Sequence, residues 1–254
     1  MDRKMLPAVA GMVVAILITT TMDATGYTAF SALPLFPLAG LLWYLQKFSR
    51  AEIGLAWGPG YAYGLAIAYP ATVLGGAALV ALLAGVVDTS NANWENARLN
   101  IMVGSTVGTL VVLLTEEGFF RGWLWAALKR AGKSDNYTLV WTSLAFTAWH
   151  ISAISLDTGF DVPAGEIPIY LVNATLLGLI WGYLRQVSGS IVVAAVCHAV
   201  WNAFAYALYG FGEKTGALGI EETHIFGPEV GFLGIVLNLG FLAAVYYQLS
   251  WKRK

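Results

Sequence analysis

Long apolar segments separated by short polar ones run through the whole chain. A transmembrane helix needs about 20 predominantly apolar residues, and eight segments reach or approach that length. They cover residues 5–22, 28–45, 61–87, 101–128, 137–154, 167–184, 191–209 and 226–249. This pattern predicts an all-α, polytopic membrane protein of about eight transmembrane helices, in which residues 1–254 form a single membrane-embedded domain.

The charged residues between these segments change sign from one loop to the next. If the N-terminus is cytoplasmic and eight helices cross the membrane, all of the 14 Lys and Arg residues except Arg98, Arg121 and Lys214 fall on the cytoplasmic side. The opposite loops collect acidic residues, namely Asp23, Asp88, Glu95, Asp157, Asp161, Glu166, Glu213, Glu221 and Glu222. Because positive charge marks cytoplasmic loops, both termini are predicted to be cytoplasmic.

The composition excludes several classes of protein. Of the 254 residues, 58% are hydrophobic and only 11% are charged, with a net charge of −1. So few charges could not cover a water-soluble globule, and without a basic excess the chain has little with which to bind nucleic acid. The single cysteine, Cys197, excludes an intramolecular disulfide and a thiolate zinc cage. We therefore expect an integral, multi-pass protein in contact with membrane lipid, and expect that membrane to be a prokaryotic cell membrane.

A few ionisable and amide side chains lie inside the apolar segments, where such groups are costly and usually functional. In chain order they are Glu116, Glu117 and Arg121 in segment 101–128, His150 in segment 137–154, and His198 and Asn202 in segment 191–209. In an α-helix, Glu117 and Arg121 can pair because they are four residues apart. Glu116 is then about 100° around the helix from Glu117 and is left free as a base.

These groups are predicted to lie at similar depth. Glu116 precedes Lys129 by 13 residues, His150 follows Lys133 by 17, and His198 follows Arg185 by 13. At 1.5 Å per residue, each group is roughly 20–25 Å from a cytoplasmic charge. Whether the three helix faces meet laterally does not follow from the sequence.

A carboxylate, two imidazoles and an amide suit activation of water for attack on a carbonyl. Glu116, His150 and His198 could also hold a divalent metal such as zinc, and a metal-free mechanism stays equally open. Other readings are a structural salt bridge, buried packing histidines or a proton-coupled transporter. No visible internal repeat supports the transporter.

Three motifs carry a family resemblance. Glu116-Glu117-x-x-x-Arg121, Phe146-x-x-x-His150 and His198-x-x-x-Asn202, in this order on separate segments, resemble the CAAX-processing and bacteriocin-immunity (CPBP) family. This family includes the type II CAAX prenyl endopeptidase, the lysostaphin-resistance protein and the abortive-infection-like membrane proteins. The motif-bearing core covers residues 101–209.

The resemblance implies an intramembrane endopeptidase, a hydrolase in which the residues matching Glu116 and His150 activate water. Those matching His198 and Asn202 stabilise the oxyanion, and Glu117, Arg121 and Phe146 support them. The expected substrate is a membrane-associated or lipidated, CAAX-like protein or peptide, cut near the cytoplasmic side or within the bilayer. The alternative is a non-catalytic immunity or scaffold protein that binds a peptide or a partner enzyme.

Overall fold

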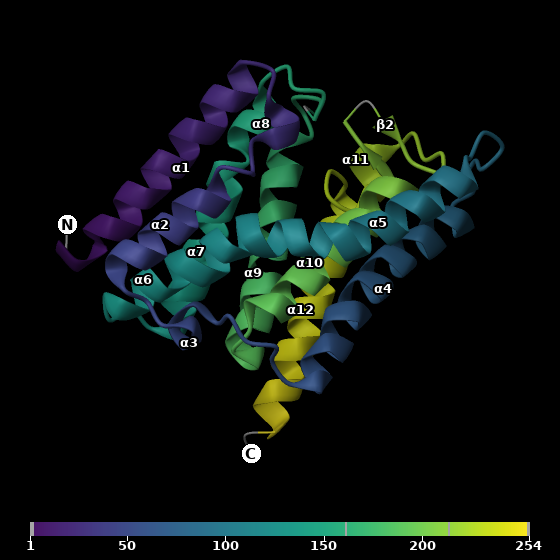
Figure 1. The fold of residues 1–254 in the computed structure, drawn as a ribbon. Helices are drawn as coiled ribbons and strands as arrows, with labels where there is room; N and C mark the ends of the chain where they lie inside the picture. The colour runs from purple at the N-terminus through teal and green to yellow at the C-terminus, as the bar shows by residue number, and fades with distance from the viewer. Residues whose placement is uncertain (1–2, 161, 213, 253–254) are drawn as a thin grey trace.

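A computed structural model describes residues 3–160, 162–212 and 214–252, so Asp161 and Glu213 of the acidic loops lie outside the described residues. The described chain is mostly helical with almost no sheet, which confirms the predicted all-α class (Figure 1). A single two-stranded antiparallel hairpin is described, in which β1 (Gly210–Phe211) pairs with β2 (Lys214–Thr215).

The helices follow one another with short connections. The short helices are η1 (Arg3–Met5), η2 (Thr28–Phe30), α3 (Arg50–Ile53), α6 (Trp125–Arg130), α8 (Ile151–Ser155) and α11 (Thr223–Phe226). The longer ones are α1 (Leu6–Ala24), α2 (Leu35–Gln46), α4 (Gly60–Leu83), α5 (Trp94–Val112), η3 (Leu113–Leu124), α7 (Asp135–Trp149), α9 (Ile167–Ser188), α10 (Ile191–Leu208) and α12 (Phe232–Lys252).

Six helical stretches of the described chain are long and apolar enough to cross a membrane, as expected for an integral multi-pass protein. They are Arg3–Ala24, Thr28–Gln46, Gly60–Leu83, Trp94–Arg130, Ile167–Ser188 and Ile191–Leu208. The other two predicted segments correspond to α7 and α12. Helix α7 has 15 residues and ends at Trp149, and the described apolar part of α12 is Phe232–Val245. The count of eight and the side of the termini stay predictions.

Polar residues set several helix boundaries. Ser49 and Glu52 form a capping box at the start of α3. Ser134 caps α7 by accepting from the amide of Tyr137, and Ser190 caps α10 by accepting from two backbone amides. Such caps satisfy amides that the first helical turn leaves unpaired. The short polar loops therefore fix where the long apolar helices begin.

Helices α9 and α10 form the centre of the molecule, between the group α1, α2 and α7 and the pair α4 and α5 (Figure 1). Close packing of α7 on α9 requires glycine at position 178, because a Cβ there would lie 3.0 Å from the Cα of Ser143. The side chains of Trp123, Trp181 and Trp201 are completely enclosed. The site described below is built on this central part of the bundle.

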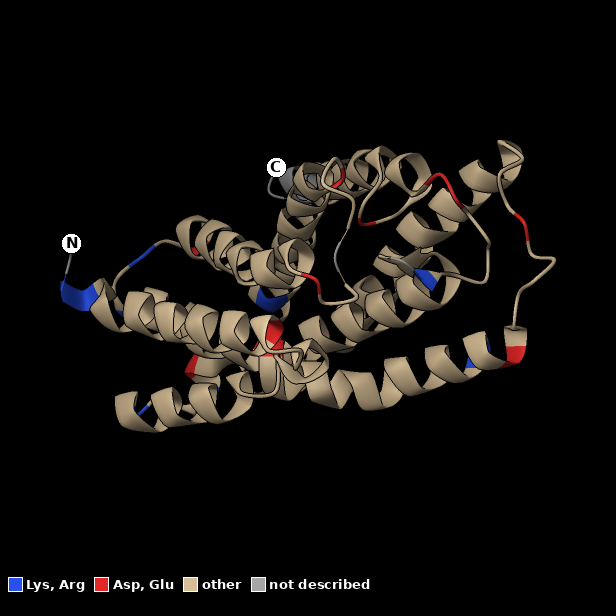
Figure 2. Cartoon of the chain, turned by 90° about the horizontal axis from the view of Figure 1, so that it is seen from above, with Lys and Arg blue, Asp and Glu red and all other residues tan. Residues whose placement is uncertain are grey.

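Basic side chains gather at the end of the molecule formed by the start of α1, the end of α2, α3, α6 and the end of α9, which we call the basic end. Three of its interactions join separate elements: Arg130 pairs with Glu52 at 2.5 Å, Lys129 with Asp135 at 2.6 Å, and Arg185 donates to the carbonyl of Glu52. The opposite end, which we call the loop end, carries η2, α8, the hairpin, α11 and the start of α9. Figure 2 shows blue near the N-terminus and mostly red on the loops of the opposite side.

Candidate active site

The first motif lies on a π-helix, η3, rather than on the regular α-helix that the sequence predicts. A π-helix pairs each residue with the fifth one along; it is rare in proteins and is frequently found at functional sites. Glycine at position 118 permits this backbone, since a Cβ there would lie 2.8 Å from the carbonyl oxygen of Leu113, five residues earlier. The expected 100° between Glu116 and Glu117 is therefore wrong for this segment. The two carboxylates nevertheless point to different partners.

Glu117 lies at the centre of a buried ionic cluster. Its Oε1 accepts from Nη1 of Arg121 at 3.0 Å and from Nδ1 of His198 at 2.9 Å, and Glu117 and Arg121 are both fully buried. Arg121 also donates from Nη2 to the carbonyl of Gly178 on α9 and lies over the ring of Phe146, 4.5 Å from its centroid. The predicted pairing of Glu117 with Arg121 is confirmed, and it links η3 to α7, α9 and α10.

Glu116 faces both histidines. Its Oε2 is 3.9 Å from Nε2 of His150 and 3.8 Å from Nε2 of His198. Both distances exceed a direct hydrogen bond, and Glu116 keeps 13% of its side chain exposed. Groups from η3, α7 and α10 thus converge laterally as well as in depth, which leaves a polar gap beside the carboxylate.

Aromatic rings hold both imidazoles in place. Nδ1 of His150 lies 2.9 Å from the carbonyl oxygen of Phe146, and the two rings are 4.3 Å apart. His198 stacks on Trp181 of α9 with ring centroids 3.6 Å apart and an interplanar angle of 14°. Phe146 therefore lies where the sequence predicts support for His150. The stacking role of Trp181 was missed, because tryptophans in an apolar chain are indistinguishable from packing residues.

A cavity of about 210 Å³ adjoins these groups. It is lined by Thr19, Thr28, Ser31, Ala32, Glu116, Trp149, His150, Ala153, Ile154, Phe160, Tyr170, Asn202, Tyr206 and Phe211. Asn202, one turn after His198, reaches this wall as predicted from its spacing. Tyr206 also lines this cavity and was missed from the sequence. Its position four residues after Asn202, on the same face of α10, could have indicated it.

A second buried polar cluster joins α9 and α10 to the loop before α12. The indole of Trp201 donates to Oε1 of Glu229 at 2.6 Å, and Asn173 donates to the carbonyls of Glu229 and Gly231 in the loop before α12. Burial raises the pKa of Glu229 to about 7. This carboxyl group was not singled out from the sequence, where it sits at the start of an apolar segment.

Within the described residues, no three or more His, Cys, Asp and Glu side chains are grouped closely enough to hold a metal ion. The carboxylate and imidazole atoms of Glu116, His150 and His198 are of the kind that zinc prefers, and a metal held by these three residues stays a prediction.

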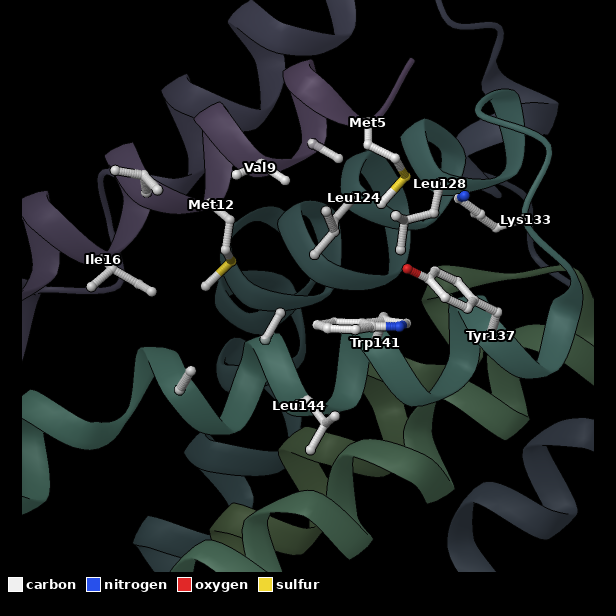
Figure 3. Close-up of a pocket in the computed structure, with 14 residues that line it drawn as sticks. Met5, Val9, Met12, Ile16, Leu124, Leu128, Lys133, Tyr137, Trp141 and Leu144 are labelled. Atoms are coloured by element: carbon white, nitrogen blue, oxygen red, sulfur yellow. The ribbon is translucent and has the colours of Figure 1, made fainter. Parts of the chain in front are cut away.

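A larger groove lies elsewhere, between α1, α6 and α7. Figure 3 shows Met12 and Ile16 of α1 opposite Trp141 and Leu144 of α7, with Lys133 at one end. Its volume is about 650 Å³ and its walls are almost wholly apolar. None of the motif residues lines it, so it is separate from the candidate active site.

Comparison with known proteins agrees with the motif pattern. Residues 98–204 match the family described as "Type II CAAX prenyl endopeptidase Rce1-like". All seven motif residues, from Glu116 to Asn202, fall inside this range. No curated protein and no solved structure matches the chain significantly.

Proposed function

We propose that this chain, whose residues 98–204 match the Rce1-like family, is an intramembrane protease of the CPBP type that hydrolyses a peptide bond with a water molecule activated by Glu116 beside His150. The observation that carries this proposal is that Nε2 of His150 and Nε2 of His198 both lie within 3.9 Å of Oε2 of Glu116, where Glu116 and His150 line a cavity. The substrate is a peptide segment associated with the membrane.

The hydrogen bonds of the rings assign their roles. A carbonyl oxygen only accepts, so Nδ1 of His150 carries the proton that binds the carbonyl of Phe146. Its Nε2 then has a lone pair directed toward Glu116 and can accept from a water. The distance of 3.9 Å between Nε2 and the carboxylate leaves a bridging water as the natural link.

His198 differs because its partner is charged. Its Nδ1 donates to the carboxylate of Glu117 at 2.9 Å, which holds the ring in one orientation, as the aspartate does in a serine protease triad. A protonated His198 presents Nε2–H on the side of Glu116. Together with the amide of Asn202, it can stabilise the oxyanion of the tetrahedral intermediate.

Glu116 both accepts and returns the proton that the reaction transfers. Glu116 takes a proton from water as the oxygen attacks the scissile carbonyl carbon, and a C–O bond forms while the carbonyl oxygen becomes an oxyanion. When the C–N bond breaks, Glu116 returns the proton to the leaving amine. Arg121 takes no part in proton transfer, because its role is to compensate the buried charge of Glu117.

The test is cleavage of a membrane-anchored peptide reporter by the purified protein. Glu116→Gln keeps the shape of the side chain but removes the base, and we expect activity to fall at least about 100-fold, the lower end of what general bases contribute. Glu95→Gln, an exposed carboxylate at the start of α5, is the matched control and should keep full activity. Full activity of Glu116→Gln would refute the mechanism, and a biological phenotype that survives it would favour the non-catalytic binder.

A further inference from the structure

The buried face of α1 ends in two polar residues. Buried positions recur every three or four residues along this helix and begin with the small residues Ala8, Gly11 and Ala15. The last two are Thr19 and Asp23, each only 2% exposed. Asp23 is therefore not a free loop charge, as the sequence suggests, but lies buried in the last turn of α1. Burial and the negative end of the helix dipole both disfavour a carboxylate there, so stability alone does not explain it.

Thr19 holds the residue that precedes His150. The indole Nε1 of Trp149 donates to Oγ1 of Thr19 at 2.6 Å, and the Thr19 hydroxyl donates in turn to the carbonyl of Ser31, just after η2, at 3.4 Å. The ring of Trp149 packs edge-on against the imidazole of His150, with centroids 4.7 Å apart and an interplanar angle of 88°. Because α1 fixes the indole, it also limits where the imidazole can lie.

Asp23 holds the chain on the other side of His150. Oγ of Ser152, in the first turn of α8, donates to Oδ2 of Asp23 at 2.6 Å, and Ser152 is only 8% exposed. Thr19 and Asp23 are four residues apart, so they share one face of α1. One helix face therefore binds the chain before and after His150, at the point where α7 ends and α8 begins.

The other hydrogen bond of His150 lies within its own segment. Its Nδ1 bonds to the carbonyl of Phe146, four residues earlier on α7, which orients the ring relative to α7. The reaction depends on a different distance, the 3.9 Å between Nε2 of His150 and Oε2 of Glu116 on η3. A misplacement of about 1 Å at such a distance can cost about 100-fold in rate. The two bonds from α1 hold the break between α7 and α8 from outside those helices.

We propose that Thr19 and Asp23 are positioning residues for the reaction: by holding Trp149 and Ser152, α1 sets the place of His150 relative to Glu116. The proposal rests on the proposed protease function. Both residues lie outside the matched range 98–204, so α1 contributes to the reaction as well as to the transmembrane bundle.

The bond between Asp23 and Ser152 gives the cleaner kinetic test, because neither residue lines the cavity beside Glu116. Asp23→Leu and Ser152→Ala should each lower kcat on a membrane-anchored peptide reporter by about 10- to 100-fold and leave KM unchanged. The double variant should be little worse than either single one, since both remove the same bond. Asp23→Asn keeps an acceptor for Ser152 and should restore kcat. Unchanged kcat in both single variants would overturn the proposal.

Thr19 provides an independent variant with a matched control. Thr19→Val removes the hydroxyl at nearly equal size and should lower kcat, whereas Thr19→Ser keeps the acceptor for Trp149 and should retain it. Thr21 lies on the same helix, is exposed, and donates to the carbonyl of Leu17 within α1, so Thr21→Val should keep full activity. Equal losses of kcat in Thr19→Val and Thr21→Val would overturn the proposal.

Magnetic resonance of the imidazoles tests the positioning without relying on catalysis. The chain has three histidines, His150, His198 and His224, whose ¹³C-labelled Cε1 signals are assigned by substitution. Asp23→Leu and Thr19→Val should move the His150 signal and leave that of His224 in place. An unmoved His150 signal would overturn the proposal, and so would equal shifts of all three signals, which would indicate a general loss of structure. If the wild-type protein cleaves no reporter, the proposed function fails, while these spectra still decide whether α1 positions His150.

Discussion

Arg121 offers the sharpest test of how the charges of the site are divided. The guanidinium group makes two hydrogen bonds, to Oε1 of Glu117 at 3.0 Å and to the carbonyl of Gly178 at 3.2 Å. Substitution Arg121→Met keeps much of the apolar stem but leaves the fully buried carboxylate of Glu117 without its cation. Breaking a buried ion pair by removing one partner typically costs about 3–5 kcal/mol.

Counting the two lost hydrogen bonds gives a similar loss of stability. Bonds to charged groups contribute about 1.5–3 kcal/mol each, so two of them account for roughly 3–6 kcal/mol. For a chain of 254 residues, each kcal/mol corresponds to about 2–4 °C in Tm. We therefore expect Arg121→Met to lower the thermal midpoint in detergent by roughly 6–20 °C. The assay is the loss of monodisperse protein with temperature, compared with wild type in the same detergent.

A double-mutant cycle separates the ion pair from simple packing. In Arg121→Met combined with Glu117→Gln, the unpaired charge is gone, so the double variant should be more stable than Arg121→Met alone. Such a reversal is the mark of two coupled residues. If Arg121→Met cost less than about 1 kcal/mol, or if the two losses simply added, the assignment of Glu117 and Arg121 to one buried, compensated pair would be refuted.

Three further perturbations test other parts of the structure. Gly118→Ala forces a Cβ to 2.8 Å from the carbonyl oxygen of Leu113, so it should lower the free energy of unfolding by about 1–3 kcal/mol and reduce reporter cleavage. At Gly75 a Cβ meets nothing within 4 Å, so Gly75→Ala should leave stability and cleavage unchanged. Equal effects of the two substitutions would refute the π-helix argument. Burial raises the pKa of Glu229 from 4.5 to about 7, so its contribution to stability is complete below pH about 4.5 and is lost as pH rises through about 7. Glu229→Gln should therefore remove up to about 3 kcal/mol of that pH dependence, measured as Tm between pH 5 and pH 8.5; an unchanged slope would contradict the shift. Exhaustive chelation should leave reporter cleavage intact, and a loss reversed by zinc, together with metal bound to the purified protein, would instead assign a metal to Glu116, His150 and His198.

The sequence was sufficient to single out ionisable groups that lie close together in the structure. In a chain with 11% charged residues, the cost of burying charge makes Glu116, Glu117 and Arg121 conspicuous without a structure. Helical spacing also paired Glu117 with Arg121 correctly, and loop charges placed the three motif helices at similar depth. These inferences depend on local geometry and on burial energetics, which the order of residues largely determines.

The remaining features depend on long-range packing. The π-helix arises where η3 must fit against α2, α5 and α10, and a single glycine at position 118 is too weak a signal to predict it. Hydrophobicity is also a poor guide to helix length near the site. The segment 137–154 is apolar enough to suggest one helix, but α7 ends at Trp149. The ring of His150, the next residue, bonds through Nδ1 to the carbonyl of Phe146.

The two neighbouring glutamates show how packing gives one residue type two functions. Glu117 is completely enclosed and compensated by Arg121, so it contributes a fixed charge to His198. Glu116 keeps contact with the cavity and has no hydrogen-bond partner in the described chain within 3.5 Å, so it remains available to water. Although the motif residues all lie within 98–204, much of the cavity's outer wall comes from outside that range, through Thr19, Thr28, Ser31, Tyr206 and Phe211. The matched range therefore contains the candidate reactive groups, while the first helices and the hairpin contribute part of the cavity wall.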